Sequence, residues 1–200
     1  MDKFKQFLKN ISPITDDEFA DTISYFTELN LQKGEFFVKQ DKVCRHIAFI
    51  LKGTLRTYYI NDKAEETTSC FCTENNLTTS YKSFILQHPS NLVLQAIEET
   101  KLLVIDYENL QKLYAKSAIW QTIGRAVAER EYIVMEQYAS VLNNETAKEK
   151  YLRLLNEQPN VLQKATKGVG KPRFDSGKNF PLPSIIRTPS PPASGVCSMK

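Results

Sequence analysis

Residues 46–60 read HIAFILKGTLRTYYI, two apolar runs on either side of Lys52 and Gly53. A Lys-Gly pair between apolar runs is a turn signal, so this stretch predicts two strands joined by a tight turn. Shorter segments of the same kind lie outward from it, at residues 35–38, 65–72, 91–97 and 101–105. Turns spaced by roughly 8 to 12 residues are typical of a β-sandwich or barrel.

Helices are expected before, within and after this β series. Thr15 precedes three acidic residues, a pattern that favours the start of a helix, and Asp106 is expected to cap another. A short helix is expected within residues 80–87, between two strands. The apolar side chains expected to face inward from the first helix are Phe4, Phe7 and Leu8.

A long amphipathic helix is predicted for residues 118–143. Its apolar face is a stripe with steps of three or four residues, which is typical of a contact between two helices. The stripe comprises Ile119, Ile123, Val127, Arg130, Val134, Tyr138 and Val141. We expect it to form a homodimer seam; packing on the chain's own barrel is the alternative. An arginine in such a stripe needs a carboxylate or a ligand as partner if it is buried.

The charge is divided unevenly along the chain. Of its 26 basic and 23 acidic residues, seven basic and one acidic lie beyond residue 160, which leaves 19 and 22 before it. Six of the nine prolines and four of the seven glycines lie in residues 164–200. No apolar period is sustained there, so we expect this tail to be disordered.

Several classes of function have no support in the sequence. The four cysteines show no metal-ligand spacing, and no phosphate-binding glycine loop occurs, so we expect no metal, cofactor or catalytic residue. Cys70 and Cys72 are expected to share one face of a strand as small wall residues, and His46 lies within an apolar strand. The apolar runs are too short to cross a membrane, and no secretory signal is visible. A cytoplasmic location is therefore expected.

Three segments together resemble one family of regulators. Residues 33–37 (KGEFF), 44–53 (CRHIAFILKG) and 55–59 (LRTYY) are similar to the barrel of the catabolite-activator/FNR (Crp/Fnr) family, in the version common in Bacteroidetes. Residues 80–84 with 89–90 resemble the counterpart of its phosphate-binding cassette. Residues 146–155 resemble the helix that opens its winged helix-turn-helix.

The resemblance implies an α+β fold, a double-stranded β-helix (jelly roll) of the cyclic-nucleotide-binding type with N-terminal helices and a long dimerisation helix. It divides the chain into a sensor barrel (1–116), a dimerisation helix (117–143), the start of a DNA-binding-like segment (144–163) and a basic tail (164–200). The family's pattern stops after Pro159, which implies that the DNA-binding head is truncated or replaced.

The resemblance also implies a small-molecule effector. Members that bind cyclic AMP carry an arginine that clamps the phosphate, but no arginine lies between Arg56 and Arg125 here, so a standard cyclic AMP site is not expected. Lys82 would supply only a point charge. The residues expected to line the site are Glu74, Asn75, Tyr81, Lys82, Ser83, Ser90, Asn91, Arg125 and Arg130.

Two functions follow from the resemblance. One is a homodimeric, ligand-responsive transcription regulator whose effector is unknown and whose DNA binding is weakened. The other is a stand-alone module that binds an effector and dimerises but has lost its DNA-binding head. We expect no membrane partner and no enzymatic activity.

Overall fold

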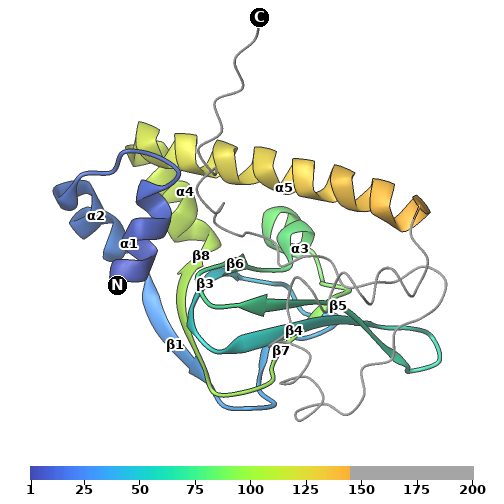
Figure 1. Ribbon diagram of the computed structural model, residues 1–200. Coiled ribbons are helices and arrows are strands. Elements are labelled where there is room, and N and C mark those ends of the chain that lie inside the picture. The colour runs from blue at the N-terminus through green and yellow to red at the C-terminus, as the bar shows by residue number, and fades with distance from the viewer. Residues whose placement is uncertain (145–200) are drawn as a thin grey trace, which may run out of the picture.

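Two four-stranded antiparallel sheets form the centre of the molecule (Figure 1). The computed structural model describes the backbone of residues 1–144 and the side chains of residues 1–136. The elements are α1 (Asp2–Lys9), α2 (Asp16–Ile23), β1 (Thr27–Leu31), β2 (Phe36–Val38), β3 (His46–Lys52), β4 (Thr54–Ile60), β5 (Glu66–Thr73), β6 (Leu77–Thr78), α3 (Tyr81–Leu86), β7 (Val93–Ala96), β8 (Thr100–Asp106), α4 (Tyr107–Lys116) and α5 (Ala118–Asn144). The expected segments 146–158 and 164–200 lie outside the described residues.

The strand order is that of a jelly roll. The first sheet has the order β1-β8-β3-β6 and the second sheet has the order β2-β7-β4-β5. Successive strands β3 and β4 lie in different sheets, and the turn between them depends on Gly53, whose φ is +95°. A side-chain carbon at this position would come within 2.6 Å of the carbonyl oxygen of Glu99. The predicted turn therefore requires glycine for both its backbone conformation and its space.

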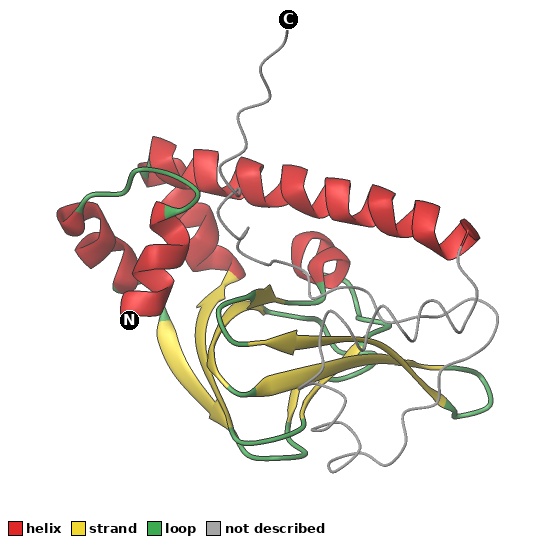
Figure 2. Ribbon diagram, viewed as in Figure 1, coloured by secondary structure: helices red, strands yellow, loops and turns green. Residues whose placement is uncertain are grey.

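Alternation along the strands of the first sheet separates two apolar cores. Ala48 and Ile50 of β3 face the second sheet, whereas Phe49 faces the helices. The inner core between the sheets comprises Leu31, Ala48, Ile50, Leu55, Cys70, Cys72, Ala96, Leu102 and Val104. The outer core joins the first sheet to α1, α4 and α5, so that the helices gather on one side of the strands (Figure 2).

The N-terminal helices follow the sequence expectation. Phe4, Phe7 and Leu8 of α1 are buried in the outer core. Thr15 forms a capping box with Glu18 at the start of α2, and Asp106 accepts a hydrogen bond from the backbone N–H of Asn109 at the start of α4. These caps satisfy N–H groups that have no partner within the helix, which explains why the helices begin where predicted.

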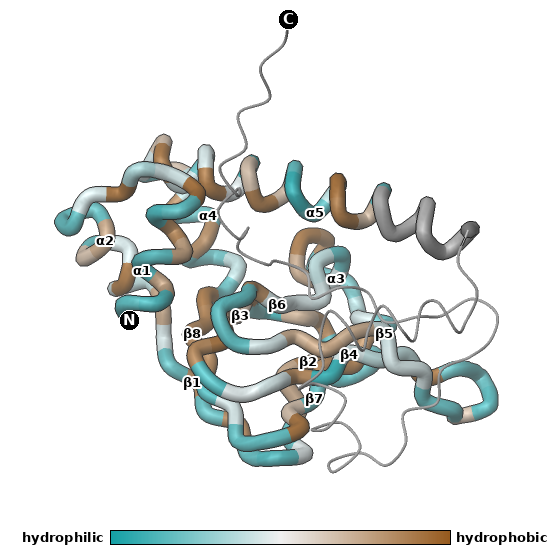
Figure 3. Tube along the Cα trace, in the orientation of Figure 1, coloured by the Kyte–Doolittle hydropathy of each residue, from teal (hydrophilic) through white to brown (hydrophobic). Residues whose placement is uncertain are grey.

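Helix α5 divides its apolar residues between the outer core and the surface, and bands of differing hydropathy alternate along it (Figure 3). Trp120 and Ile123 are buried in the outer core, and Ile119 and Val127 pack against it. The first three residues of the expected dimer stripe therefore pack on the chain's own core. This is the alternative to a dimer seam that the sequence left open. Arg130 and Val134 are half-buried, and the side chains of Tyr138 and Val141 lie outside the described part.

The exposed apolar residues of α5 follow a different face from the predicted stripe. Tyr132 is 71% exposed, and Ile133 and Met135 are each 52% exposed. No helix among residues 1–144 is long and apolar enough to cross a membrane.

Candidate effector site

Strands β5 and β6 follow one another in the chain but belong to different sheets. Each of these strands is the last of its sheet, and a short turn at residues 74–76 joins them. Helix α3 follows β6 directly, and α5 passes over it (Figure 1). We refer to five residues of β5, of β6 with its preceding residue, and of α5 as the open-side cluster: Cys70, Cys72, Asn76, Thr78 and Glu131.

Strand pairing determines which residues of β5 and β6 point inward. Cys70 and Cys72 lie opposite Thr57 and Leu55, and both cysteines belong to the inner core. On β6, Thr78 lies opposite the inward-facing Ala48, because paired residues of antiparallel strands share a face. Asn76, two residues earlier, points the same way. The prediction that Cys70 and Cys72 share one face as wall residues is confirmed, since both are buried in the inner core.

Polar side chains dominate the β6 side of this cluster. Thr78 is 1% exposed and Asn76 is 6% exposed. The Nδ2 of Asn76 donates to the carbonyl oxygens of Glu74 (3.0 Å) and Thr73 (3.2 Å). Within the part of the chain that the structure describes, the Oδ1 of Asn76 and the Oγ1 of Thr78 are buried and have no hydrogen-bond partner.

Glu131 completes the cluster from α5. Burial raises the pKa of its carboxyl from the usual 4.5 to about 8, against the opposing influence of Arg130, and the nearby Cys72 raises it further. The Oε1 of Glu131 is buried and, among the described residues, has no hydrogen-bond partner. Burial also lowers the pKa of Arg130, which is half-buried beside it. The sequence pattern placed Arg130 in the inward stripe, whereas the residue with the buried carboxyl is its neighbour Glu131.

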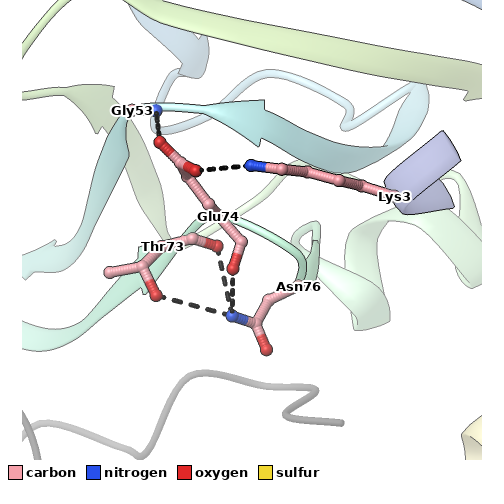
Figure 4. A network of polar contacts seen from close by, with 5 residues as sticks. All are labelled: Lys3, Gly53, Thr73, Glu74 and Asn76. Atoms are coloured by element: carbon pink, nitrogen blue, oxygen red, sulfur yellow. Dashed lines mark hydrogen bonds and ion pairs between the residues drawn. The ribbon is translucent and has the colours of Figure 1, made fainter. Parts of the chain in front are cut away.

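The predicted site residue Glu74 lies at the turn between β5 and β6 (Figure 4). Its carboxylate accepts from Lys3 of α1 at 3.0 Å and from the backbone N–H of Gly53 at 3.3 Å. Asn75, in the left-handed conformation with φ of 65°, donates its backbone N–H to Ile50. Glu74 therefore ties the turn to α1 and to the β3–β4 turn.

The other predicted loop residues lie at the opposite end of β3. Thr79 donates to the carbonyl oxygen of His46, four residues before Ile50, which is a separation of about 13 Å along a strand. The structure therefore does not bring Glu74 and Asn75 together with residues 81–91 in one place.

Ser83 and Ser90 have structural hydrogen bonds. The Oγ of Ser90 donates to the Oγ of Ser80 at 2.8 Å, and the Oγ of Ser83 accepts from the backbone N–H of Cys44 at 2.9 Å. Ser83 and Ser90 are 3% and 2% exposed. The bond between Ser90 and Ser80 joins the two ends of the α3 loop, and the bond from Cys44 ties α3 to the segment before β3.

The remaining predicted residues are spread over the surface. Lys82 and Asn91 are exposed. Tyr81 is 44% exposed and lines an apolar pocket beneath α5 that also includes Tyr114 and Gly124. Arg125 was expected to reach the site from α5. Its side chain instead lies on the outer face of the helix, paired with Glu129 at 3.0 Å.

No described group of three or more His, Cys, Asp and Glu residues is arranged to hold a metal ion. His46 is half-buried, and burial lowers the pKa of its imidazole. Its carbonyl oxygen accepts hydrogen bonds from Thr79 and Cys44. This environment fits a structural histidine in the barrel wall.

Comparison with known proteins agrees with the strand order. Residues 28–117 match the family model of the cyclic nucleotide-binding domain. The matched segment spans strands β2 to β8 and helix α4, so the similarity covers the whole of the second sheet and most of the first. A search of curated proteins finds no match to the chain.

Solved structures with this domain have the same fold. The catabolite activator protein of Thermus thermophilus is 18% identical with a TM-score of 0.59, over 74% of this chain and 71% of that chain. A cyclic nucleotide-binding domain from Methylobacillus flagellatus is 13% identical with a TM-score of 0.59, over 78% of this chain and 83% of that one. The N-terminal domain of a transcriptional regulator from Streptomyces coelicolor is 18% identical with a TM-score of 0.52, over 62% and 91%. The predicted α+β jelly roll is therefore confirmed.

Sequence reasoning did not find Asn76, Thr78 or Glu131. A weak signal was present for the first two, because β-strand alternation places them on the face of the apolar Ala48 and Ile50. For Glu131, the stripe of α5 predicted Arg130 as the inward residue, one position away. Consecutive helical residues lie about 100° apart, so an error of one residue moves a side chain to another face.

Proposed function

We propose that this protein is a ligand-responsive regulator of the catabolite-activator type, which forms a homodimer through α5. The observation that carries the proposal is a cyclic nucleotide-binding domain followed by a helix of 27 residues, Ala118–Asn144. The first half of this helix is buried on the domain, and its second half exposes Tyr132, Ile133 and Met135. A helix exposing large apolar side chains is a candidate for pairing with a second copy.

The mechanism follows from this division of α5. A ligand held between β5, β6 and Glu131 would contact the barrel and the helix together. Such a ligand stabilises one position of α5 relative to the barrel, and it shifts the population by its difference in affinity for the two positions. In a dimer that shift also changes the geometry of whatever follows α5.

The dimer is tested by light scattering and analytical ultracentrifugation of the full chain at micromolar concentration. We expect a mass of two 22.9 kDa chains. Ile133→Asp is expected to weaken the dimer at least tenfold, because it places a charge in the apolar contact. Gln111→Asp on the exposed face of α4 is the control that adds the same charge elsewhere. A monomeric wild-type chain would refute the dimer and the regulatory mechanism built on it.

A stand-alone sensor is the second candidate, and the sequence beyond residue 163 favours it, since it lacks the periodicity of a recognition helix. Gel-shift titrations against random and selected duplexes distinguish the two. Tight binding to one palindrome supports the regulator. A dimer that shifts no duplex at moderate salt supports the sensor, and weak binding with a steep salt dependence is the behaviour of the basic tail alone.

A further inference from the structure

Three acceptor oxygens of the open-side cluster are buried without a partner among the described residues: Oδ1 of Asn76, Oγ1 of Thr78 and Oε1 of Glu131. A buried polar atom without a hydrogen-bond partner destabilises the folded state. The Nδ2 of Asn76 donates to two carbonyl oxygens, which fixes its Oδ1 as the free atom, and an amide oxygen can only accept. The hydroxyl of Thr78 and the carboxylate of Glu131 can accept as well, so a group that donates hydrogen bonds would satisfy all three oxygens.

The charges around these oxygens favour the same group. The segment from Glu66 to Thr78 contains no lysine or arginine. On β4, Arg56 is already committed, because its Nη1 lies 2.7 Å from Glu66 and its Nε donates to Thr68. The titratable groups that face Glu131 are Arg130 on its own helix and Cys70 and Cys72 on β5. No described side chain on β5 or β6 thus provides a positive charge for the carboxyl of Glu131.

We propose that the open-side cluster binds a small organic cation, an alkylamine or amidine, whose N–H groups donate to Asn76, Thr78 and Glu131. This inference rests on the proposed function, since it assigns the effector class of the same domain. An ammonium group carries three donors and an amidinium group a planar set of them, so either can satisfy all three oxygens. Because the buried carboxyl of Glu131 holds a proton at neutral pH, binding of a cation releases that proton.

The same features disfavour an anionic cyclic phosphate. The loop around α3 joins its two ends by the Ser90–Ser80 hydrogen bond, and residues 57–124 contain no arginine. Cyclic AMP is therefore the control ligand, which we expect to bind more weakly than a cation.

The experiment is isothermal titration calorimetry of the full chain at pH 7 with putrescine, agmatine, benzamidine and cyclic AMP. We expect at least one cation to bind more tightly than cyclic AMP. Repeating the titration in buffers with different ionisation enthalpies should show release of close to one proton per ligand. Failure of all three cations at millimolar concentration, or tighter binding of cyclic AMP, overturns the proposal.

Variants separate the cluster from the helix surface. Glu131→Gln is expected to weaken cation binding at least tenfold and to abolish proton release, and Thr78→Val to weaken binding several-fold. Glu129→Gln, on the exposed face of the same helix, should bind as the wild type does. Unchanged binding in both Glu131→Gln and Thr78→Val contradicts the assignment. A wild-type dimer that binds no cation refutes only the ligand class, whereas a monomer refutes the proposed function.

Discussion

A single acidic residue, Glu131, gives this domain a pH-dependent stability. Burial raises its pKa to about 8 in the folded chain, whereas an unfolded chain returns it to the usual 4.5. Between these values the folded state binds more protons, so its stability is fully present below 4.5 and is lost as the pH rises toward 8. The direction is opposite to that of a salt-bridged carboxylate.

We therefore expect Glu131→Gln to remove the loss of stability that the wild type shows as the pH rises from 4.5 to about 8. Glutamine keeps the shape of the protonated acid but cannot ionise. Urea unfolding over this range and above it should show the two proteins converging at acidic pH, the variant gaining on the wild type as the pH rises toward 8, and a constant difference at higher pH. Parallel curves for the two proteins would show that Glu131 is not desolvated; Glu129→Gln, an exposed carboxylate, is the control.

At the scale of elements, α4 and α5 meet at a glycine. Gly124 of α5 lies against Tyr114, and a side-chain carbon at this glycine would come within 2.5 Å of the tyrosine hydroxyl oxygen and 2.7 Å of the ring. The Tyr114 ring packs against the outer core, and burial raises the pKa of its hydroxyl. Close packing of the two helices thus outweighs the low helix propensity of glycine.

This contact predicts that Gly124→Ala changes stability in opposite directions in the wild type and in the Tyr114→Ala variant. In the wild type, Gly124→Ala is expected to lower the melting temperature, although alanine favours a helix by about 1 kcal/mol over glycine. With Tyr114→Ala already present, the same substitution should raise stability by up to about 1 kcal/mol. A stabilising Gly124→Ala in the wild type would show that Tyr114 moves freely.

At the scale of the whole molecule, α1 connects regions that are far apart in sequence. Phe4 is buried against Phe49 of β3, with ring centroids 5.1 Å apart. The neighbouring Lys3 pairs with Glu74 on the β5–β6 turn at 3.0 Å. Residues 28–117, which match the family model, therefore complete their outer core with segments on both sides of that match.

Substitutions at these adjacent positions should differ greatly in effect. Phe4→Ala is expected to cost about 3–5 kcal/mol of stability, because it leaves a cavity in the outer core. Lys3→Ala removes an exposed ion pair and is expected to cost less than about 1 kcal/mol. Chemical denaturation of both variants measures the difference, and equal losses would mean that α1 is held by its charges and not by its apolar face.

The sequence by itself determined the strand series, the Gly53 turn, the helix caps and the long α5, because each depends on residues close in the chain. It also placed Cys70 and Cys72 on one inward face, since strand alternation is local. The position of the cluster that we propose as the effector site was decided only by tertiary structure. The pairing of β6 with β3 turns Asn76 and Thr78 inward, and the packing of α5 brings Glu131 near Cys72.

The predicted site residues also divide into features set by the local sequence and features set by packing. Glu74, Ser83 and Ser90 are polar residues in the expected loops, but packing gives their side chains partners within the chain. The direction in which α5 turns its side chains depends on how its first half packs on the outer core. A contact between segments more than 50 residues apart determines that rotation, and no local pattern specifies it.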